Sequence, residues 1–315
     1  MTMGDTVSDK SPAAVGEVSE VSEASTAPVD PSRLVFVHRS HPLRWFFALA
    51  VILVVATFVT ALAKNDNVDY ATIGQYLFAP EILAGLLKTL VLTVLLMALA
   101  IVLGMVLAVM RLSSDPVAKA TAWTYIWFMR GVPVLVQMIF WFNIGLVISV
   151  IHVGIPGTDV QFAELDTNTL MTPFMAALFG LGLAEAAYMA EIIRGGLMGV
   201  DKGQAEAAAA VGMTGYQSFR HIVMPQAWRI VVPPVGNEFI TMFKVTSLAS
   251  VVGVTELLGA ARMISATNYK VFELLLVATF WYLVCTTVLS VVQYLLERRL
   301  GRSYRSTSSP REAVS

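Results

Sequence analysis

The sequence predicts an all-α integral membrane protein with about six transmembrane helices. Composition gives the first indication, because 57% of the residues are hydrophobic, only 14% are charged, and the mean hydropathy is +0.71. Soluble domains usually carry about 25% charged residues, so an ordinary soluble fold is excluded. The second indication is a series of uncharged apolar runs, each close to the roughly 20 residues that a helix needs to cross a bilayer.

The first 32 residues form a separate region. They are rich in Ser, Val, Ala and acidic side chains, and Lys10 is their only basic residue. A segment with few large apolar residues and unbalanced charge buries too little surface to fold. We expect residues 1–32 to be a disordered acidic tail, and nothing in them suggests a specific role.

The apolar runs come next, and each predicts one membrane-spanning helix. Five of them contain no charged residue: 45–63, 89–110, 131–151, 167–184 and 274–296. A sixth run, 230–255, is interrupted by Pro233, Pro234, Glu238 and Lys244. We expect this run to begin irregularly, which a membrane tolerates only where the backbone faces protein or water.

The first run, 45–63, also resembles a cleavable signal sequence. Basic residues precede it, and Ala61-Leu62-Ala63 stands before Lys64. Its length and the acidic tail before it favour an uncleaved helix. We therefore interpret residues 33–84 as an extra N-terminal transmembrane helix followed by an external linker.

Lysine and arginine residues are distributed unequally between the two sides of the membrane that six spans define. The side that holds both termini carries most of them: Arg33, Arg39, Arg44, Arg111, Lys119, Arg130, Arg194, Lys202, Arg220, Arg229, Arg298, Arg299, Arg302 and Arg305. The other side carries only Lys64, Lys88, Arg262 and Lys270. Loops with an excess of Lys and Arg stay in the cytoplasm. Both termini, including a tail at 301–315, and the loop 201–225 are therefore expected to be cytoplasmic.

The polar loop 201–225 predicts a short helical hairpin. Asp201 followed by Gln204 predicts an N-cap with a reciprocal partner three residues later. The run 205–210 is alanine except for Glu206, so the first helix has almost no side-chain bulk. Another surface can therefore approach its backbone closely.

The second half of this loop predicts a corner and a second helix. Gly212 stands where the first helix should end in a left-handed residue. Thr214 and Gln217 repeat the capping pattern at the start of the next helix, and Pro225 is expected to stop that helix. The local prediction is helix, tight corner, helix, stop.

Residues 203–225 of this loop resemble the EAA loop of ABC-importer permeases. Glu206-Ala207-Ala208, then Gly212, and then Ile222 and Pro225 match that pattern, with Met224 in place of the usual Leu. Around it the chain resembles the polar amino-acid branch of the family. The matching segments are Arg-Gly-Val-Pro-Val-Leu-Val-Gln (130–137), 185–196, Pro225-Gln-Ala, 233–238, 244–250 and Glu256-Leu. The resemblance covers roughly residues 85–300.

This resemblance implies a fold, a function and partners. The fold is a five-helix type-1 permease core over residues 85–300, and the function is import of a polar amino acid across the bacterial cell membrane. The implied partners are two ATPase subunits, an extracytoplasmic solute-binding protein, and a second permease subunit that is identical or different. No cofactor is implied for this chain. The residues implied to couple the membrane helices to the ATPase are Gly203, Glu206, Ala207, Ala208, Gly212, Ile222 and Pro225.

Signals for catalysis are absent from the sequence. It contains no Gly-x-x-x-x-Gly-Lys-Ser/Thr phosphate loop, so the chain has no usual ATP site. Its four histidines are scattered without metal-ligand spacing, and its one cysteine, Cys285, lies in an apolar run. A net charge of −1 without a basic stripe gives no pull toward nucleic acid. We expect no enzymatic activity, metal site or nucleic-acid partner.

Polar side chains within the sixth run predict a solute path. Asn237, Thr241 and Lys244 are four and three residues apart, so they share one face of a helix, and Ser247 follows them. A charge at membrane depth costs at least ~2.5 kcal/mol on insertion scales, so Glu238 and Lys244 need an explanation. These residues line a path for the ammonium and carboxylate of an amino acid, or they form a structural pair or a subunit contact. The sequence leaves both interpretations open.

Other polar residues carry weaker signals. Gln137 and Asn143 are secondary path candidates, although isolated amides more often bond a neighbouring helix. The segment 130–133 predicts a helix start at the inner membrane boundary, with Arg130 reaching to the surface. Glu185 and Glu191 are expected to be solvated beside the cytoplasmic loop.

Two other classes of function remain open from the sequence alone. A self-sufficient secondary transporter or channel predicts internal repeats and intramembrane ion ligands, whereas this sequence shows no clear repeat and few intramembrane carboxylates. A membrane scaffold that transports nothing would use the polar residues of 237–247 for assembly. Uptake measured with and without an ATPase separates these classes.

Overall fold

A computed structural model of the chain describes residues 42–154 and 161–305. The acidic tail predicted for residues 1–32 lies outside the described residues, as do residues 306–315 of the predicted C-terminal tail. The chain divides into two compact units, one that ends at Lys64 and one that begins at Asn65.

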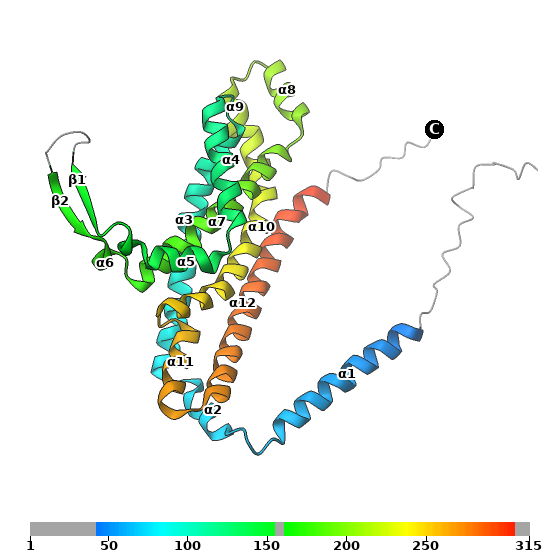
Figure 1. Cartoon of the computed structure of the whole chain (residues 1–315). Coiled ribbons are helices and arrows are strands. Elements are labelled where there is room, and N and C mark those ends of the chain that lie inside the picture. Colours follow the sequence, from blue (N-terminus) through cyan, green and yellow to red (C-terminus); the bar gives the residue numbers. More distant parts are fainter. Residues whose placement is uncertain (1–41, 155–160, 306–315) are drawn as a thin grey trace, which may run out of the picture. The chain divides into compact units, whose positions relative to one another are not determined.

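The described part of the first unit is helix α1, Pro42–Ala63 (Figure 1). Its large hydrophobic side chains from Trp45 to Val59 are exposed, where they are described. A helix that is apolar around its whole circumference suits a lipid environment. The helix predicted at 45–63 is therefore present, and it begins at Pro42.

The second unit is a bundle of helices with a β-hairpin on one side. Its elements in chain order are α2 (Tyr70–Leu77), α3 (Pro80–Leu112), α4 (Pro116–Gly131), α5 (Val134–Phe142), η2 (Ile144–Leu146), β1 (Val150–Gly154), β2 (Gln161–Asp166), α6 (Thr167–Leu170), α7 (Pro173–Met198), α8 (Lys202–Ala210), α9 (Gly215–Ser218), η3 (Phe219–Val223), α10 (Met224–Val245), η4 (Thr246–Val252), α11 (Leu257–Asn268) and α12 (Val271–Arg305). Helices α8 and α9 lie at one end of this bundle, and α2 and α11 lie at the opposite end (Figure 1).

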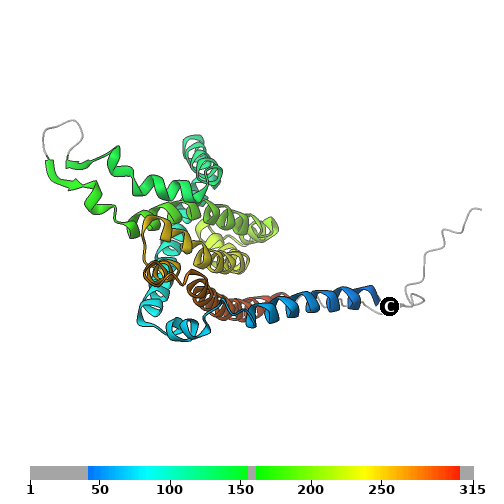
Figure 2. The ribbon, with the colours of Figure 1, turned by 60° about the horizontal axis from the view of Figure 1, so that its bottom comes forward.

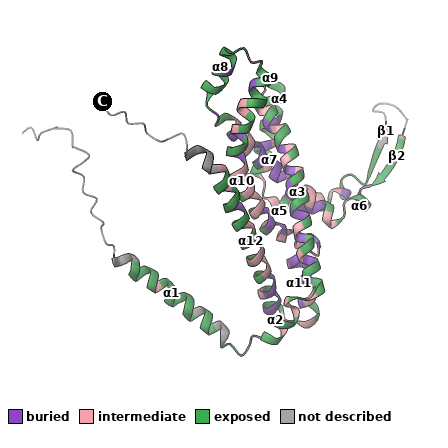
Figure 3. Cartoon of the chain, turned by 180° about the vertical axis from the view of Figure 1, so that it is seen from behind, coloured by how far each residue is buried: buried purple, intermediate pink, exposed green. Residues whose placement is uncertain are grey.

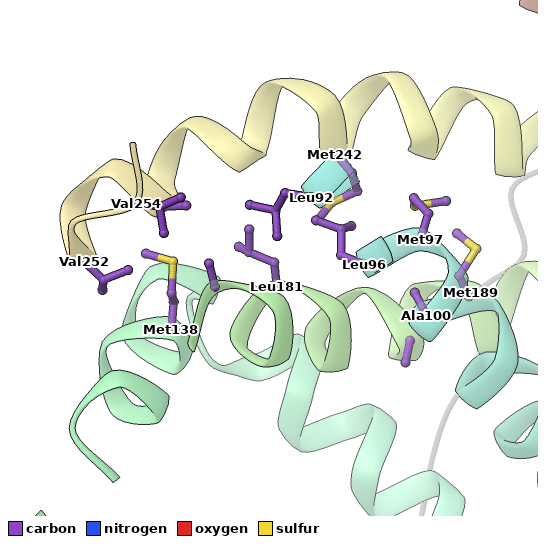
Figure 4. Close-up of a cluster of buried hydrophobic side chains, with 13 residues drawn as sticks. Leu92, Leu96, Met97, Ala100, Met138, Leu181, Met189, Met242, Val252 and Val254 are labelled. Atoms are coloured by element: carbon purple, nitrogen blue, oxygen red, sulfur yellow. The ribbon is translucent and has the colours of Figure 1, made fainter. Parts of the chain in front are cut away.

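Helices α3 and α7 make the most extensive contact within the bundle. Leu92 and Leu96 of α3 and Leu181 of α7 belong to one buried cluster, which Met242 of α10 also joins (Figure 4). Small residues let the helices approach, because a Cβ atom on Gly104 would lie 2.5 Å from the Cβ atom of Met189. Close backbone approach through small residues is the usual way in which membrane helices pack.

The end of the bundle near α2 has its own packing. A second buried cluster joins Ile82 of α3 and Leu257 of α11 to Leu274 of α12. Helix α2, which the sequence did not predict within 33–84, is attached to α12 by Trp281, whose indole Nε1 donates to the carbonyl oxygen of Leu77 at 2.7 Å. Helix α3 also begins earlier than predicted, at Pro80, a favourable first residue for a helix.

The prediction of one straight membrane span at 131–151 is wrong. Helices α4 and α5 meet at 99°, and Val132 between them is extended, with φ −99° and ψ 132°. Pro133 accounts for the break, because it has no N–H group and disfavours helical backbone in the residue before it. The segment 130–133 is therefore the corner between two helices, and the helix start predicted there is confirmed, because α5 begins at Val134 with Pro133 as its N-cap.

The chain after α5 forms a hairpin of two strands. Strands β1 and β2 are antiparallel, with Val150 opposite Asp166 and His152 opposite Glu164. Figures 1 and 2 show this hairpin projecting away from the helices. The β-branched residues Val150, Ile151 and Val153 favour a strand, but the uncharged run 131–151 was interpreted as a membrane helix.

Two further spans differ from their predictions, whereas the span predicted at 274–296 lies within α12. Helix α7 begins at Pro173 and continues to Met198, well beyond the predicted end at 184. Helix α10 runs through Pro233 and Pro234 without a break, so the irregular start expected for 230–255 is wrong. Irregularity lies at the other end, where η4 is a 3₁₀ helix that ends at Gly253 with φ 92°.

Three described helices, α3, α7 and α12, are long and apolar enough to cross a membrane. Two bent combinations, α4 with α5 and 215–252 with α11, bring the number of spans to as many as five. Figure 3 shows that the outward faces of these helices are mostly exposed, and large apolar side chains make up much of that surface. A wide apolar surface on a folded bundle is what contact with lipid requires.

Candidate functional site

Helix α8 presents a small, exposed surface at one end of the bundle. Asp201 caps it, because its Oδ1 accepts from the backbone N–H of Gly203 at 2.8 Å. Glu206 and Ala207 are exposed, whereas Ala208 is buried against the rest of the loop. The reciprocal bond predicted for Gln204 is absent, because the Gln204 Oε1 accepts instead from Gln226 Nε2 at 3.4 Å. This bond links α8 to α10.

The corner after α8 has the predicted left-handed glycine. Gly212 has φ 81°, and a Cβ atom there would meet nothing within 4 Å. The N–H of Met213 donates to the carbonyl oxygen of Ala208, and the N–H of Gly212 donates to that of Ala209, both at 3.0 Å. This pair of bonds is the Schellman motif, so the requirement for glycine is conformational and not steric.

Helix α9 begins with the predicted capping box. Thr214 Oγ1 accepts from the N–H of Gln217 at 3.3 Å, and the Gln217 side chain accepts from the N–H of Thr214 at 2.8 Å. Both halves of the hairpin are thus fixed by local hydrogen bonds, which are satisfied before any partner binds. An exposed surface with a fixed backbone is suited to docking.

The stop predicted at Pro225 is wrong. The π-helical turn η3 joins α9 directly to α10, and Pro225 lies in the first turn of α10. Proline is tolerated there because the first N–H groups of a helix have no acceptor within it. Ile222 is half-buried in η3. The hairpin therefore continues as a helix into the membrane segment.

Helix α10 carries the predicted polar stripe. Asn237, Thr241 and Lys244 are all exposed along one side of the helix, whereas Glu238 is half-buried beside them. Ser247 is half-buried in η4. No salt bridge within the described residues includes Lys244 or Glu238, so a pair between these two residues does not explain them. The stripe is a polar surface open to water, solute or another subunit.

Gln137 lies at the corner between α4 and α5 and not on the stripe. Its side chain is buried, and Nε2 donates to the carbonyl oxygens of Met129 at 2.8 Å and Val132 at 2.9 Å. These carbonyls lie where the bend ends α4, so the amide replaces hydrogen bonds that the helix would have made. Asn143 likewise bonds its own helix, donating from Nδ2 to the carbonyl oxygen of Ile139.

The prediction that Glu185 is solvated beside the cytoplasmic loop is wrong. It lies within α7, is 5% exposed, and its Oε1 has no hydrogen-bond partner. Buried carboxyl groups are normally paired or hydrogen-bonded, so an unpartnered one marks a candidate site. The sequence signal that could have indicated burial is the alanine on both sides of Glu185, since small residues mark close helix packing.

Glu191 is also not simply solvated. It binds Arg194 one turn along α7, with Oε2 2.6 Å from Arg194 Nη2, and its Oε1 lies 3.9 Å from Arg111 Nε of α3. These partly buried charges connect the α3 and α7 ends near the hairpin. Arg130 takes a different partner, because its guanidinium lies 5.0 Å from the centre of the Tyr188 ring. Within the described residues, no group of three His, Cys, Asp or Glu side chains is placed to hold a metal ion.

The family comparison covers most of the bundle. Residues 100–302 match the family model described as binding-protein-dependent transport system inner membrane component. An arginine transport system permease protein of Corynebacterium glutamicum is 41% identical over 274 residues, covering 86% of this chain and 84% of that protein. A nopaline transport system permease protein of Agrobacterium fabrum is 36% identical, covering 72% of this chain and 90% of that protein.

Solved structures agree with this match. The crystal structure of an amino acid ABC transporter with histidines is similar with a TM-score of 0.63 and 34% identity, covering 74% of this chain and 99% of that chain. A methionine ABC transporter in an inward-facing conformation is similar with a TM-score of 0.51 and 19% identity, covering 73% of this chain and 97% of that chain. At that identity the second likeness concerns the fold alone.

Proposed function

The chain belongs to the family of binding-protein-dependent transport system inner membrane components, and on this premise we propose how its surfaces serve transport. It is the permease subunit of an ATP-binding-cassette importer and carries a polar amino acid across the bacterial cell membrane. The names of four relatives give four different solutes, which are arginine, nopaline, glutamine and cystine. These names support an amino acid or a related compound as the solute of this permease.

The observation that carries the proposal is the exposed hairpin formed by α8 and α9. It lies at one end of the membrane helices, has little side-chain bulk, and is fixed by the Schellman motif and the capping box. Such a surface fits a groove on an ATPase, with Glu206 as its one charge in the alanine run 205–210. We assign the coupling role to Gly203, Glu206, Ala207, Ala208, Gly212, Ile222 and Pro225.

The proposed assembly contains two permease subunits, identical or different, two ATPase subunits on the cytoplasmic side, and a solute-binding protein on the outer side. Both termini of this chain are placed in the cytoplasm with the hairpin, in keeping with the Lys and Arg distribution. The permease family is not itself catalytic, so ATP hydrolysis is assigned to the partner. ATP-driven closure of the ATPase pair would move each hairpin and shift the helices between inward-open and outward-open arrangements.

The polar stripe on α10 is the proposed solute path. Asn237, Thr241 and Lys244 are exposed on one side of a membrane helix. Lys244 has no acidic partner among the described residues, so its ammonium is free to bind a carboxylate. Lys244→Met should abolish uptake while the permease still assembles with the ATPase. Normal uptake by Lys244→Met would show that Lys244 does not bind the solute.

The test of the coupling role uses two substitutions at Gly212. Valine at φ 81° is strained by roughly 1–2 kcal/mol, so Gly212→Val should weaken ATPase binding about tenfold. Asparagine tolerates the left-handed conformation, so Gly212→Asn should retain most of the binding and is the matched control. Co-purification of the ATPase and permease abundance in the membrane are measured together. Equal ATPase binding by both variants and normal uptake would show that the hairpin is not the coupling element.

The overall class of function is tested by uptake of a labelled amino acid into vesicles. Permease alone is compared with permease, ATPase and binding protein together. Uptake that needs ATP and all components is expected. Uptake by the permease alone would identify a secondary transporter or channel, and no uptake under any condition would identify a membrane scaffold.

A further inference from the structure

Helix α4 carries one basic and two aromatic side chains along one side. Lys119, Trp123 and Trp127 are spaced four residues apart, which places them next to one another on the helix surface. All three side chains are exposed. The two indole rings lie nearly parallel, with centroids 6.2 Å apart and planes 10° apart. We call these three residues the α4 stripe.

The ammonium group of Lys119 has no acidic partner in the described part of the chain. None of the salt bridges there includes Lys119. The acid one turn before it, Asp115, is used by the helix cap, because its carboxylate accepts from the N–H groups of Val117 at 3.1 Å and Ala118 at 3.3 Å. The positive charge is therefore available to an anion from outside the chain.

The two indole N–H groups are also available. Neither Trp123 nor Trp127 donates a hydrogen bond from Nε1 to a described residue, whereas Nε1 of Trp281 donates to the carbonyl oxygen of Leu77 at 2.7 Å. An exposed tryptophan combines an apolar ring with one polar N–H group, and this combination suits the boundary between water and the lipid chains.

The order of the α4 stripe matches the layers of a membrane surface. The start of α4 lies at the same end of the bundle as α8 and α9 (Figures 1 and 3), the end that the Lys and Arg distribution assigns to the cytoplasm. Helix α4, combined with α5, is long and apolar enough to cross a membrane. Lys119 precedes Trp123 by about 6 Å and Trp127 by about 12 Å along the helix. The ammonium group would thus reach the phosphate layer, and the indole rings would lie below it.

Charge indicates which molecule covers the α4 stripe. Helix α4 contains no acidic residue, so an anionic partner meets no opposing carboxylate on this helix. A second copy that packed α4 against α4 about a two-fold axis would bring the two Lys119 ammonium groups toward each other. A zwitterionic headgroup carries its own cation, which competes with Lys119 for the phosphate. A headgroup with a net negative charge has no such competitor.

We propose that the α4 stripe binds an anionic phospholipid of the inner leaflet. The ammonium group of Lys119 contacts the lipid phosphate, and the indole N–H groups of Trp123 and Trp127 donate to headgroup and ester oxygens. An acyl chain lies along the two rings. This site is separate from the hairpin and from the polar stripe on α10, and it does not depend on which solute is carried.

The experiment measures quenching of tryptophan fluorescence by brominated lipids in the purified full-length permease. The permease is reconstituted in phosphatidylcholine that contains either brominated phosphatidylglycerol or brominated phosphatidylcholine. The same titrations of the double variant Trp123→Phe/Trp127→Phe are subtracted, so that the signal of these two rings remains. Phosphatidylglycerol should be preferred about fivefold, which corresponds to one lysine at an anionic lipid surface.

Substitutions at Lys119 test the charge. Lys119→Gln removes the ammonium group and should bring the preference close to one. Lys119→Arg keeps the positive charge and should retain most of the preference. Lys202→Gln is the matched control, because Lys202 is an exposed lysine of α8 at the same end of the bundle, and this variant should behave like wild type.

Each outcome decides the proposal. Equal quenching by the two lipids in wild type would show contact with lipid but no selection, and an unchanged preference in Lys119→Gln would show that this ammonium group does not select. Either result overturns the proposal. Absence of quenching of the two rings by both lipids would show that protein covers this face, which overturns it as well. If Lys119→Gln does not fold, wild type at high salt provides the same test, because an ionic preference must then fall.

Discussion

Two buried glutamates of the bundle differ in their partners. Glu256 begins α11 near the α2 end of the bundle and is 0% exposed, and its oxygens accept from the N–H groups of Leu258 at 2.9 Å and Gly259 at 2.7 Å and from Tyr282 Oη at 2.8 Å. Glu185 in α7 is 5% exposed, and its Oε1 has no partner. Burial is therefore similar, and hydrogen bonding separates a carboxyl group that caps a helix from one whose Oε1 has no hydrogen-bond partner.

The largest expected effect comes from Glu256→Ala. The substitution removes the N-cap of α11 and leaves two backbone N–H groups and the Tyr282 hydroxyl without an acceptor. Each unpaired buried group costs ~1–3 kcal/mol, so the free energy of unfolding should fall by at least about 3 kcal/mol. Thermal unfolding in detergent and permease abundance in the membrane measure the loss. Glu256→Gln keeps one acceptor oxygen and should lose less, and an alanine variant as stable as wild type would show that these bonds contribute nothing.

A smaller effect is expected for Tyr282→Phe, which removes one donor to Glu256 and leaves the backbone donors in place. One hydrogen bond to a buried group contributes about 1 kcal/mol, so a modest drop in unfolding temperature is expected. Tyr294→Phe is the control, because Tyr294 lies on the same helix and is exposed. Equal stability of the two phenylalanine variants would show that the Glu256 cluster does not depend on this bond.

Glu185→Gln should change stability little. The substitution keeps the shape of a buried side chain whose Oε1 has no hydrogen-bond partner to lose, so the free energy of unfolding should stay within ~0.5 kcal/mol of wild type. The same unfolding assay that detects the loss in Glu256→Ala provides the scale. A drop comparable to that of Glu256→Ala would mean that Glu185 is a structural carboxyl group after all, and the contrast between the two sites would fail.

A small effect that depends on pH is expected at Asp69, an acid outside the membrane segments. Hydrogen bonds from Thr72, together with the ammonium of Lys270 at 3.2 Å, lower the pKa of Asp69 from 3.8 to about 2. A lowered folded-state pKa stabilises the folded protein above pH 3.8, and this contribution is lost as the pH falls toward 2. Between pH 3.8 and pH 2 the unfolding temperature of wild type should fall slightly more than that of Asp69→Asn. If the unfolding temperatures of the two proteins change in the same way with pH, Asp69 makes no such contribution.

Local chemistry made the hairpin predictable from the sequence. Its conformation depends on contacts between residues at most five positions apart, as in the capping box of Thr214 and Gln217 and the left-handed turn at Gly212. The local sequence is therefore sufficient to predict it. The shared face of Asn237, Thr241 and Lys244 follows likewise from helical periodicity alone.

Features that depend on distant segments were not predictable in the same way. The burial of Glu185 depends on the helices packed against α7, and most of these lie far from Glu185 in the sequence. Pro133 indicates a break in the helix. The uncharged run 131–151 was nevertheless long enough to be interpreted as one membrane span, so the α4–α5 corner and strand β1 were not predicted. Pro233 and Pro234 misled in the opposite direction, because α10 continues through both prolines, which a helix in a packed bundle tolerates.

The direct connection of α9 to α10 through η3 has a mechanical consequence. Residues 215–245 are helical without an intervening loop and extend for about 45 Å at 1.5 Å per residue. A helix is stiff along its axis, so a displacement applied at the hairpin reaches Lys244 almost undiminished. The π turn at Phe219–Val223 is the one part of residues 215–245 that is not α-helical. Part of the displacement can be lost there if this turn deforms. If the ATPase docks on the hairpin as proposed, the distance that its surface moves sets the largest displacement available to the face of α10 that carries Lys244.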